Sequence, residues 1–142
     1  NGNDYGTEVS TGRYDALNGL VLKGDGKGNF APQSILQSGI YIPGNGKALV
    51  KLQDKNNDYL IAAAQNRGPL KVFQLKEKLR SVKVNQQDVS AAIVLKNGKT
   101  QKQEFYFGSS FLSQSARFLS ISNNMVSVTV YDVNGKSRKI NL

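Results

Sequence analysis

The sequence predicts an all-β fold, on two observations. First, short apolar or alternating runs recur along the chain and are separated by segments rich in Gly, Asn and Asp, a pattern typical of sandwiches, barrels and propellers. Second, no long run with helical periodicity is present. The predicted strands are Gly19–Lys23, Ala48–Leu52, Tyr59–Ala64, Leu70–Leu75, Ser81–Val84, Ala91–Leu95, Gln103–Phe107, Phe118–Ser122, Val126–Val130 and Arg138–Leu142.

The segments between these runs are predicted to be turns, because Gly and Asn tolerate positive φ and Asx side chains bond their own backbone. The segment GDGKGNF at 24–30 has an alternative interpretation, because glycine-rich loops can also bind phosphate. A phosphate-binding loop needs Gly-Lys-Ser/Thr and a following helix. Neither is evident after Gly28, so we interpret this segment as a turn between two strands.

The last two runs predict a hairpin with a defined register. If residues 133–135 form a three-residue loop whose last residue is left-handed, Asp132 faces Lys136. Val128 then faces Ile140, and apolar residues pair across the strands. A two-residue turn would instead pair apolar with polar residues, so we prefer the first register.

Two short segments carry weak helix signals. Leu75–Leu79 is too short to form an isolated helix, and we interpret it as a linker. Ser109–Arg117 has the spacing of a helical turn with a serine cap, but a tight loop fits equally well. The linker separates two predicted domains, residues 1–75 and residues 76–142.

Composition excludes several classes of site. The chain has no Cys and no His, which excludes zinc, copper and iron–sulfur centres and every mechanism that needs an imidazole base. Nearly all carboxylates lie in turn-like contexts, and no pair suited to glycoside hydrolysis stands out. We therefore predict no catalytic residues and a protein that is not an enzyme.

The positive charge of the chain is concentrated in its second half. Residues 1–75 hold eight Lys and Arg against six Asp and Glu, whereas residues 76–142 hold eleven against four, a net charge of +7. Such a surface favours anionic partners, so nucleic-acid binding by this half is an alternative interpretation. The other interpretation is an ordinary solvated surface.

One loop has the alternation of a calcium site. Asp54, Asn56 and Asp58 place oxygen ligands on alternate residues, as calcium loops do. However, Tyr59 stands where the loop glycine would be, and no bidentate Glu follows. An Asx turn that closes a hairpin explains the same residues, and calcium stays an open alternative as the one cofactor.

The first half carries a weak repeat and a family resemblance. Gly19 and Gly68 precede similar strands 49 positions apart, close to a propeller-blade period. NDYGTEVSTGRYDALNGLVLKGDGKGNF, which ends in a glycine-rich turn at Gly24 to Phe30, resembles an FG-GAP/VCBS repeat. LQDKNNDYLIAAAQNRGPLKVF resembles the next copy.

The second half is similar to a different family domain. FGSSFLSQSARFLSI and VSVTVYDVNGKSRKI resemble the ASPIC/UnbV domain, with Phe111 in place of Tyr and Ala116 in place of Ser in its core motif. That domain commonly follows such repeats, as in the cartilage acidic protein family. The resemblance implies propeller-blade-like antiparallel strands followed by a small β-sandwich- or barrel-like domain.

The resemblance also implies where the protein is located, how its repeats bind calcium and how it assembles. It implies an exported protein in the periplasm, at the outer-membrane surface or outside the cell. Family repeats often bind calcium through an Asp-rich loop, which is shortened here, with Asp58 matching its final Asp. The chain would hold only the last one or two blades, so exposed strand edges predict a homodimer or a compact rearrangement.

Together these observations predict a non-enzymatic exported β-rich interaction module that binds a protein or a glycan. The alternatives are an accessory or catalytic domain of a carbohydrate-active enzyme, and the nucleic-acid binder described above. No apolar run is long enough for a membrane span. The predicted binding residues lie at loop-like strand ends, where ligand-binding groups are often displayed. They are Arg13, Tyr14, Gln65, Asn66 and Arg67.

Overall fold

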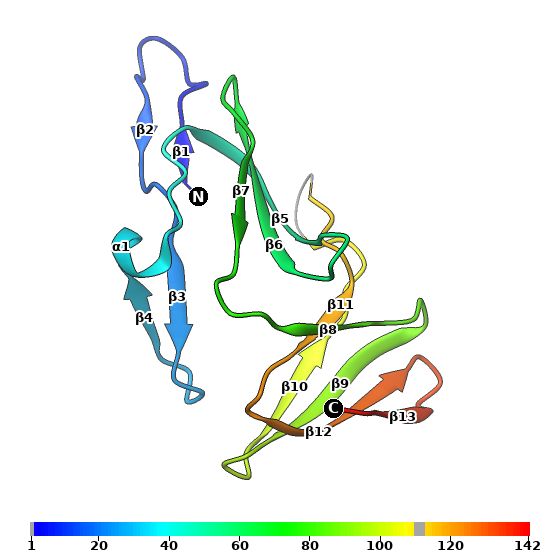
Figure 1. Ribbon diagram of the computed structural model, residues 1–142. Coiled ribbons are helices and arrows are strands. Elements are labelled where there is room, and N and C mark those ends of the chain that lie inside the picture. Colours follow the sequence, from blue (N-terminus) through cyan, green and yellow to red (C-terminus); the bar gives the residue numbers. More distant parts are fainter. Residues whose placement is uncertain (1, 110–112) are drawn as a thin grey trace. The chain divides into compact units, whose positions relative to one another are not determined.

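The computed structural model describes residues 2–109 and 113–142 and is almost entirely built of β-strands (Figure 1). The described residues form thirteen strands in five sheets and one helix of a single turn. The sheets are antiparallel, and the strands do not close into a barrel within the described residues. The predicted all-β fold class is therefore confirmed. No described helix has the length and apolar character needed to cross a bilayer.

The chain divides into two compact units. The first comprises Asn1–Val50 and Ile61–Phe73, and the second comprises Lys51–Leu60 and Gln74–Leu142. The change of unit at 73/74 lies close to the predicted domain boundary after residue 75. In addition, ten residues around the turn at 54–58 belong to the second unit.

The first unit contains two short hairpins. The strands are β1 (Asn3–Asp4), β2 (Tyr14–Asp15), β3 (Val21–Gly24) and β4 (Phe30–Gln33), and they pair as β1–β2 and β3–β4. The turn between β3 and β4 is the glycine-rich segment, as the sequence predicts. The sequence analysis did not anticipate β1, β2 and β4, because these strands are too short to show periodicity.

The helix α1 (Ile35–Ser38) was also not predicted, because the sequence after the glycine-rich segment shows no convincing helical pattern. It begins with a capping box, in which the Ser34 side chain accepts from the Gln37 N–H and the Gln37 side chain accepts from the Ser34 N–H. Gly39 ends it at φ 71°. Serine followed three residues later by glutamine was the available signal.

A third group of strands forms a three-stranded sheet in the order β5–β6–β7. Its strands are β5 (Asn45–Gln53), β6 (Tyr59–Asn66) and β7 (Lys71–Gln74). β5 and β6 each cover one predicted strand, and β7 lies within the predicted strand Leu70–Leu75. Leu75–Leu79 then connects β7 to the next strand without a helix, as predicted for a linker.

The second unit has a four-stranded sheet in the order β10–β9–β12–β13 and a two-stranded sheet, β11–β8. The strands are β8 (Arg80–Lys83), β9 (Asp88–Leu95), β10 (Thr100–Glu104), β11 (Phe118–Ile121), β12 (Met125–Asp132) and β13 (Ser137–Ile140). Alternate residues of β9 and β12 pack against β11 and the loops beside it. The core they form is Val84, Ala91, Ile93, Leu95, Phe105, Leu119, Ile121, Val128 and Val130.

The register of the β12–β13 hairpin matches the predicted one. Val128 pairs with Ile140, and the Asp132 N–H donates to the Lys136 carbonyl at 3.0 Å. Gly135 is left-handed, with φ 77°. The alternative two-residue turn is therefore excluded.

The position of β10 differs from the prediction. The expected strand was Gln103–Phe107, but the ladder with β9 runs over Thr100–Glu104. The reason is that the aromatic run enters the core: Phe105 is buried, and its N–H donates to the Val89 carbonyl at 2.9 Å. The prediction of a helical turn or loop at Ser109–Arg117 lies partly outside the described residues, which omit 110–112.

Three hairpin turns share one construction, which explains the role of their acidic residues. In each, one Asp oxygen accepts the N–H groups of the second and fourth residues that follow it, and the third residue has positive φ. The turns begin at Asp25, Asp54 and Asp132. These carboxylates serve backbone geometry, because each satisfies donors that the turn would otherwise leave unpaired.

Candidate functional site

Two neighbouring hollows in the first unit form the candidate site. The larger hollow has a volume of about 900 Å³, and the smaller about 430 Å³. The larger is lined by Tyr5, Gly6, Thr7, Pro43, Gly44, Asn45, Gln65, Asn66, Arg67, Gly68, Pro69 and Lys71. The smaller is lined by Asn3, Tyr5, Arg13, Asp15, Ala16, Leu17, Asn18, Tyr41 and Pro43.

Tyr5 and Pro43 line both hollows and form the wall between them. The Tyr5 hydroxyl donates to the Pro43 carbonyl at 2.8 Å, which fixes the ring. The Arg13 guanidinium carbon lies 4.9 Å from the centroid of the Tyr5 ring. Arg13 lines the smaller hollow but not the larger one. We infer that Arg13 covers the ring face on that side and that the opposite face is open to a ligand in the larger hollow.

A buried asparagine holds this wall in place. Asn3 is 3% exposed, and its Nδ2 donates to Asn18 Oδ1 at 2.8 Å and to the Pro43 carbonyl at 3.1 Å. Its Oδ1 accepts the Leu17 N–H at 3.1 Å. Because the side-chain amide joins three separate segments, the wall is rigid before any ligand arrives.

Gln65 supports the floor of the larger hollow. Its Oε1 accepts the Gly44 N–H at 2.7 Å and its Nε2 donates to the Pro69 carbonyl at 2.8 Å. A Cβ at position 44 would clash with Gln65 Oε1, so any other residue there would displace the Gln65 amide from this hydrogen bond. Gln65 therefore shapes the site, whereas its neighbours Asn66 and Arg67 are exposed at the end of β6.

The predicted binding residues are thus divided between the two hollows. Gln65, Asn66 and Arg67 line the larger, and Arg13 lines the smaller. Tyr14 is exposed on β2 and lines neither hollow. The structure adds Tyr5, which sequence reasoning missed because no local pattern brings it to Pro43, 38 positions away.

Charges at the smaller hollow are arranged around Asp15. Its carboxylate pairs with Arg13 Nε at 2.7 Å, and both groups are exposed. The nearby Tyr5 hydroxyl, followed by the hydrogen bond from Arg13, lowers the pKa of Asp15. The same carboxylate raises the pKa of Tyr5. At neutral pH Asp15 is therefore ionised and Tyr5 keeps its proton, which it donates to the Pro43 carbonyl.

The residues of the predicted calcium loop lie in the turn between β5 and β6. Asp54 Oδ1 accepts the N–H groups of Asn56 and Asp58, each at 2.8 Å. Asp58 Oδ2 accepts from Gln74 Nε2 at 2.8 Å. Asn57 occupies the left-handed position at φ 64°. The geometry is that of an Asx turn that closes the hairpin.

Paired substitutions separate the turn role of Asp54 from a calcium role. Asp54→Asn keeps an oxygen acceptor, so it should change the free energy of unfolding by less than about 0.5 kcal/mol. Asp54→Ala removes the acceptor and should cost about 1 kcal/mol. Thermal melting of both variants with and without millimolar calcium tests this. A calcium-dependent rise in Tm that Asp54→Asn abolishes would instead assign the loop to calcium.

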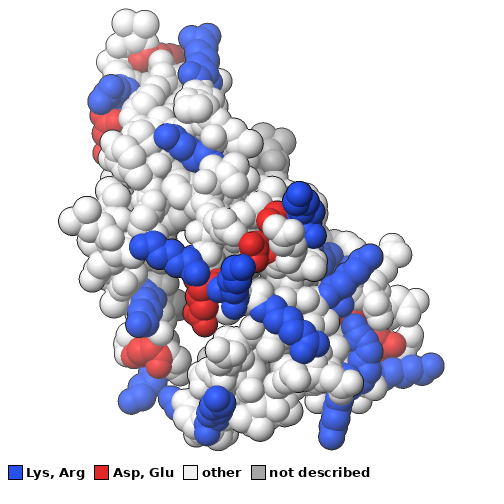
Figure 2. Space-filling model, in the orientation of Figure 1, with Lys and Arg blue, Asp and Glu red and all other residues white. Residues whose placement is uncertain are grey.

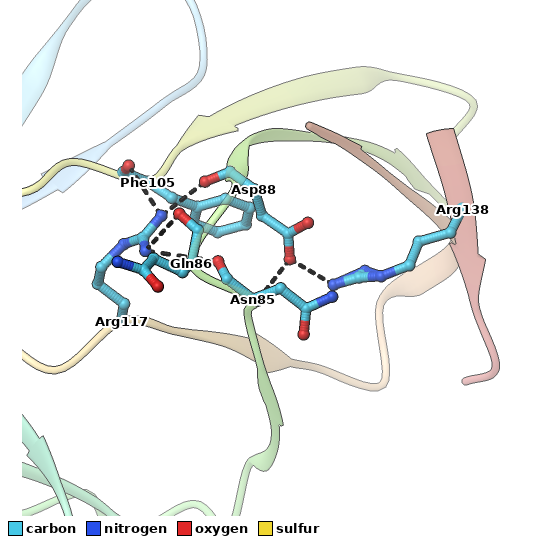
Figure 3. A network of polar contacts seen from close by, with 6 residues as sticks. All are labelled: Asn85, Gln86, Asp88, Phe105, Arg117 and Arg138. Carbon is cyan, nitrogen blue, oxygen red and sulfur yellow. Dashed lines mark hydrogen bonds and ion pairs between the residues drawn. The ribbon is translucent and has the colours of Figure 1, made fainter. Parts of the chain in front are cut away.

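The second unit holds a denser polar network (Figure 3). Asp88 is buried and pairs with Arg138, and its Oδ2 also accepts the Asn85 N–H at 2.6 Å. Arg117 donates to the backbone carbonyls of Asp88 at 2.6 Å and Phe105 at 3.4 Å. It also reaches the carbonyls of the Asn85–Gln86 turn. Both terminal nitrogens of Arg117 and one of Arg138 are used within the chain, whereas Arg117 Nε and the other terminal nitrogen of Arg138 are buried without a partner among the described residues. Because most of these contacts are internal, we assign the network to stability.

Comparisons of the chain with protein-family models, curated proteins and solved structures found no match. The resemblance to FG-GAP/VCBS repeats and to the ASPIC/UnbV domain therefore stays a prediction from the quoted motifs.

Proposed function

We propose that the protein is a non-enzymatic binding module whose two hollows in the first unit take a glycan. The observation that carries this proposal is the Tyr5 wall, a fixed aromatic ring between two polar hollows. An aromatic face beside convergent amides and hydroxyls suits a sugar ring, which offers C–H groups on one side and hydroxyls around its edge.

The lining of the larger hollow supplies matching donors and acceptors. Asn66 contributes an exposed amide, and Arg67 and Lys71 contribute positive charge. The Thr7 hydroxyl and Asn45 Oδ1 lie behind this surface, buried and without a hydrogen-bond partner in the described part of the chain. Among the described residues that line this hollow there is no carboxylate. Glycoside hydrolysis needs two carboxylates across the scissile bond. Binding without hydrolysis is therefore the chemistry this hollow supports.

The wider setting of the module is also a proposal. On the resemblance, the module belongs to an exported FG-GAP/VCBS protein and presents its glycan site outside the cytoplasm. An accessory role beside the catalytic domain of a carbohydrate-active enzyme is consistent with a hollow that binds without cleaving.

A glycan array followed by titration calorimetry on the best binder tests the proposed site. Tyr5→Ala should reduce affinity at least tenfold, because a stacked aromatic in a binding pocket contributes more than about 1.4 kcal/mol. Tyr5→Phe keeps the ring and should lose less. Arg67→Ala should weaken binding by about threefold to tenfold, since it removes an exposed charge and a donor.

Tyr14→Ala is the matched control. Tyr14 is an exposed tyrosine in the same unit that lines neither hollow, so this variant should bind like the parent. Equal losses in Tyr14→Ala and Tyr5→Ala would contradict the proposed site, and so would an array with no glycan bound. If the chain instead binds a protein and Tyr5→Ala abolishes that binding, the site would be assigned to a protein partner, the other partner class that the sequence predicts.

A further inference from the structure

Small side chains cover the middle of the outer face of the four-stranded sheet. Side chains alternate across a sheet, and Ala91, Ile93, Val128 and Val130 are buried in the core. Their neighbours on β9 and β12 therefore face outward. Most of these outward residues are small, as with Ala92 and Thr129, and they lie over the two central strands.

Lysines stand on both sides of these small residues. Lys102 of β10 pairs with Ala92, Ala92 pairs with Thr129, and Thr129 pairs with Lys139 of β13. One row across the sheet thus reads Lys–Ala–Thr–Lys, with the lysines on the two edge strands. Three strand spacings separate their backbones by about 14 Å. Long basic side chains at the edges and short ones between them define the trough.

The trough keeps a net positive charge because two of the three nearby acids are used elsewhere and only Glu104 lies on its face. Asp88 is buried against Arg138, and Asp132 Oδ1 accepts two N–H groups of its own turn. Glu104 is the one carboxylate at the outward positions of the four strands. It bonds Lys102 at 2.7 Å and accepts the Tyr106 hydroxyl. No ion pair of the described residues involves Lys139.

The surrounding surface has the same sign. Residues 76–142 carry a net charge of +7, and over the second unit Lys and Arg side chains outnumber Asp and Glu on the face shown in Figure 2. Lys96 and Lys99 are exposed in the turn between β9 and β10, at one end of the trough. A linear anionic chain lying along the strands would meet positive charge on both sides and at this end.

We propose that this trough binds a linear acidic polysaccharide, one that carries carboxylate or sulfate groups along its length. The side chains between the lysines favour a polysaccharide over nucleic acid. Single-stranded nucleic acid is held by several aromatic platforms, whereas Tyr131 is the one aromatic at the outward positions of these strands. Ser90, Ser127 and Thr129 offer hydroxyls instead. This site is in the other unit from the proposed glycan hollows and does not depend on them.

Binding of a fluorescent heparin fragment to the full chain, at about 50 mM salt, tests the trough, with neutral dextran as the uncharged comparison. Lys102→Gln and Lys139→Gln should each weaken binding about fivefold, as expected for one close charge contact in water. Glu104→Gln should strengthen binding to a similar degree, because it removes the one carboxylate that opposes the ligand. Added salt should weaken binding of all forms.

Lys23→Gln is the matched control, since Lys23 is an exposed lysine on β3 of the first unit; it should change affinity less than twofold. Equal weakening by Lys23→Gln, no effect of Glu104→Gln, or no heparin binding would overturn the proposal. Tighter binding of an oligothymidylate that responds to the same variants would overturn it in favour of nucleic acid. Tyr5→Ala should leave heparin binding unchanged, which separates this result from the glycan test.

Discussion

Replacing Arg117 by alanine is expected to lower the free energy of unfolding of the second unit by about 3 kcal/mol. The guanidinium donates to four backbone carbonyls, those of Asn85, Gln86, Asp88 and Phe105. Each hydrogen bond to a charged donor contributes about 1.5–3 kcal/mol when well formed. Three of these four bonds are long, so the expected loss of stability is well below the sum for four well-formed bonds. Denaturant unfolding followed by circular dichroism measures the change.

Two companion variants identify the source of the loss. Arg117→Lys keeps the charge but has no planar fork to reach several carbonyls, so it should recover less than half of the stability. Phe107→Ala removes the exposed ring that lies 3.9 Å from the guanidinium carbon and should cost at most about 1 kcal/mol. If Arg117→Ala lowers the free energy of unfolding less than Phe107→Ala does, the hydrogen bonds to the carbonyls are not the source of the stability that Arg117 provides.

The features that sequence reasoning predicted correctly are those set by neighbouring residues. The β12–β13 register follows from the turn at Gly135 and from the apolar pair Val128 and Ile140 within the same hairpin. The turn role of Asp25 likewise needs only residues up to Asn29. Local rules of turn chemistry are sufficient in both places, because every donor and acceptor lies within five residues.

Apart from α1, whose capping box is a local signal, the main features that sequence reasoning missed depend on distant partners. The Tyr5 wall joins residues 38 positions apart, and Arg117 reaches carbonyls 12 to 32 positions away. Burial of Phe105 sets the end of β10. The sequence alone does not indicate this end, because the aromatic run 105–107 could equally well continue the strand. Burial and long-range bonding decide such cases, and a single sequence carries no local mark of either.

The largest single loss is expected at Phe118, where Phe118→Ala should cost about 4 kcal/mol. Phe118 is 1% exposed. Its ring meets the Tyr59 ring edge-on, with centroids 5.5 Å apart, and Lys51 Nζ lies 4.4 Å from its centroid. Truncation leaves a cavity under both neighbours. Thermal melting and denaturant unfolding should agree on the loss, and Phe118→Leu should cost roughly half as much because it fills part of the volume.

Phe118 also explains why the ten residues 51–60, the β5–β6 turn with the adjoining strand ends, belong to the second unit. Lys51 and Tyr59 come from that segment and pack on one ring, while Lys51 backbone groups bond Ser115 and Ala116. Phe118→Ala should therefore loosen the segment as well as the core, seen as faster amide exchange at 51–60. Unchanged exchange there would show that the backbone bonds alone hold the segment.

Lys51→Met distinguishes the packing of this lysine from its charge. Burial lowers the pKa of Lys51, so the folded chain holds that proton less tightly than the unfolded chain. Stability therefore rises with pH between the lowered pKa and the ordinary value of 10.5. Lys51→Met keeps the apolar stem over Phe118 and should abolish that rise without loss of stability at neutral pH. A loss as large as that of Phe118→Ala would mean that the ammonium, through its contact with the ring, holds the segment in place.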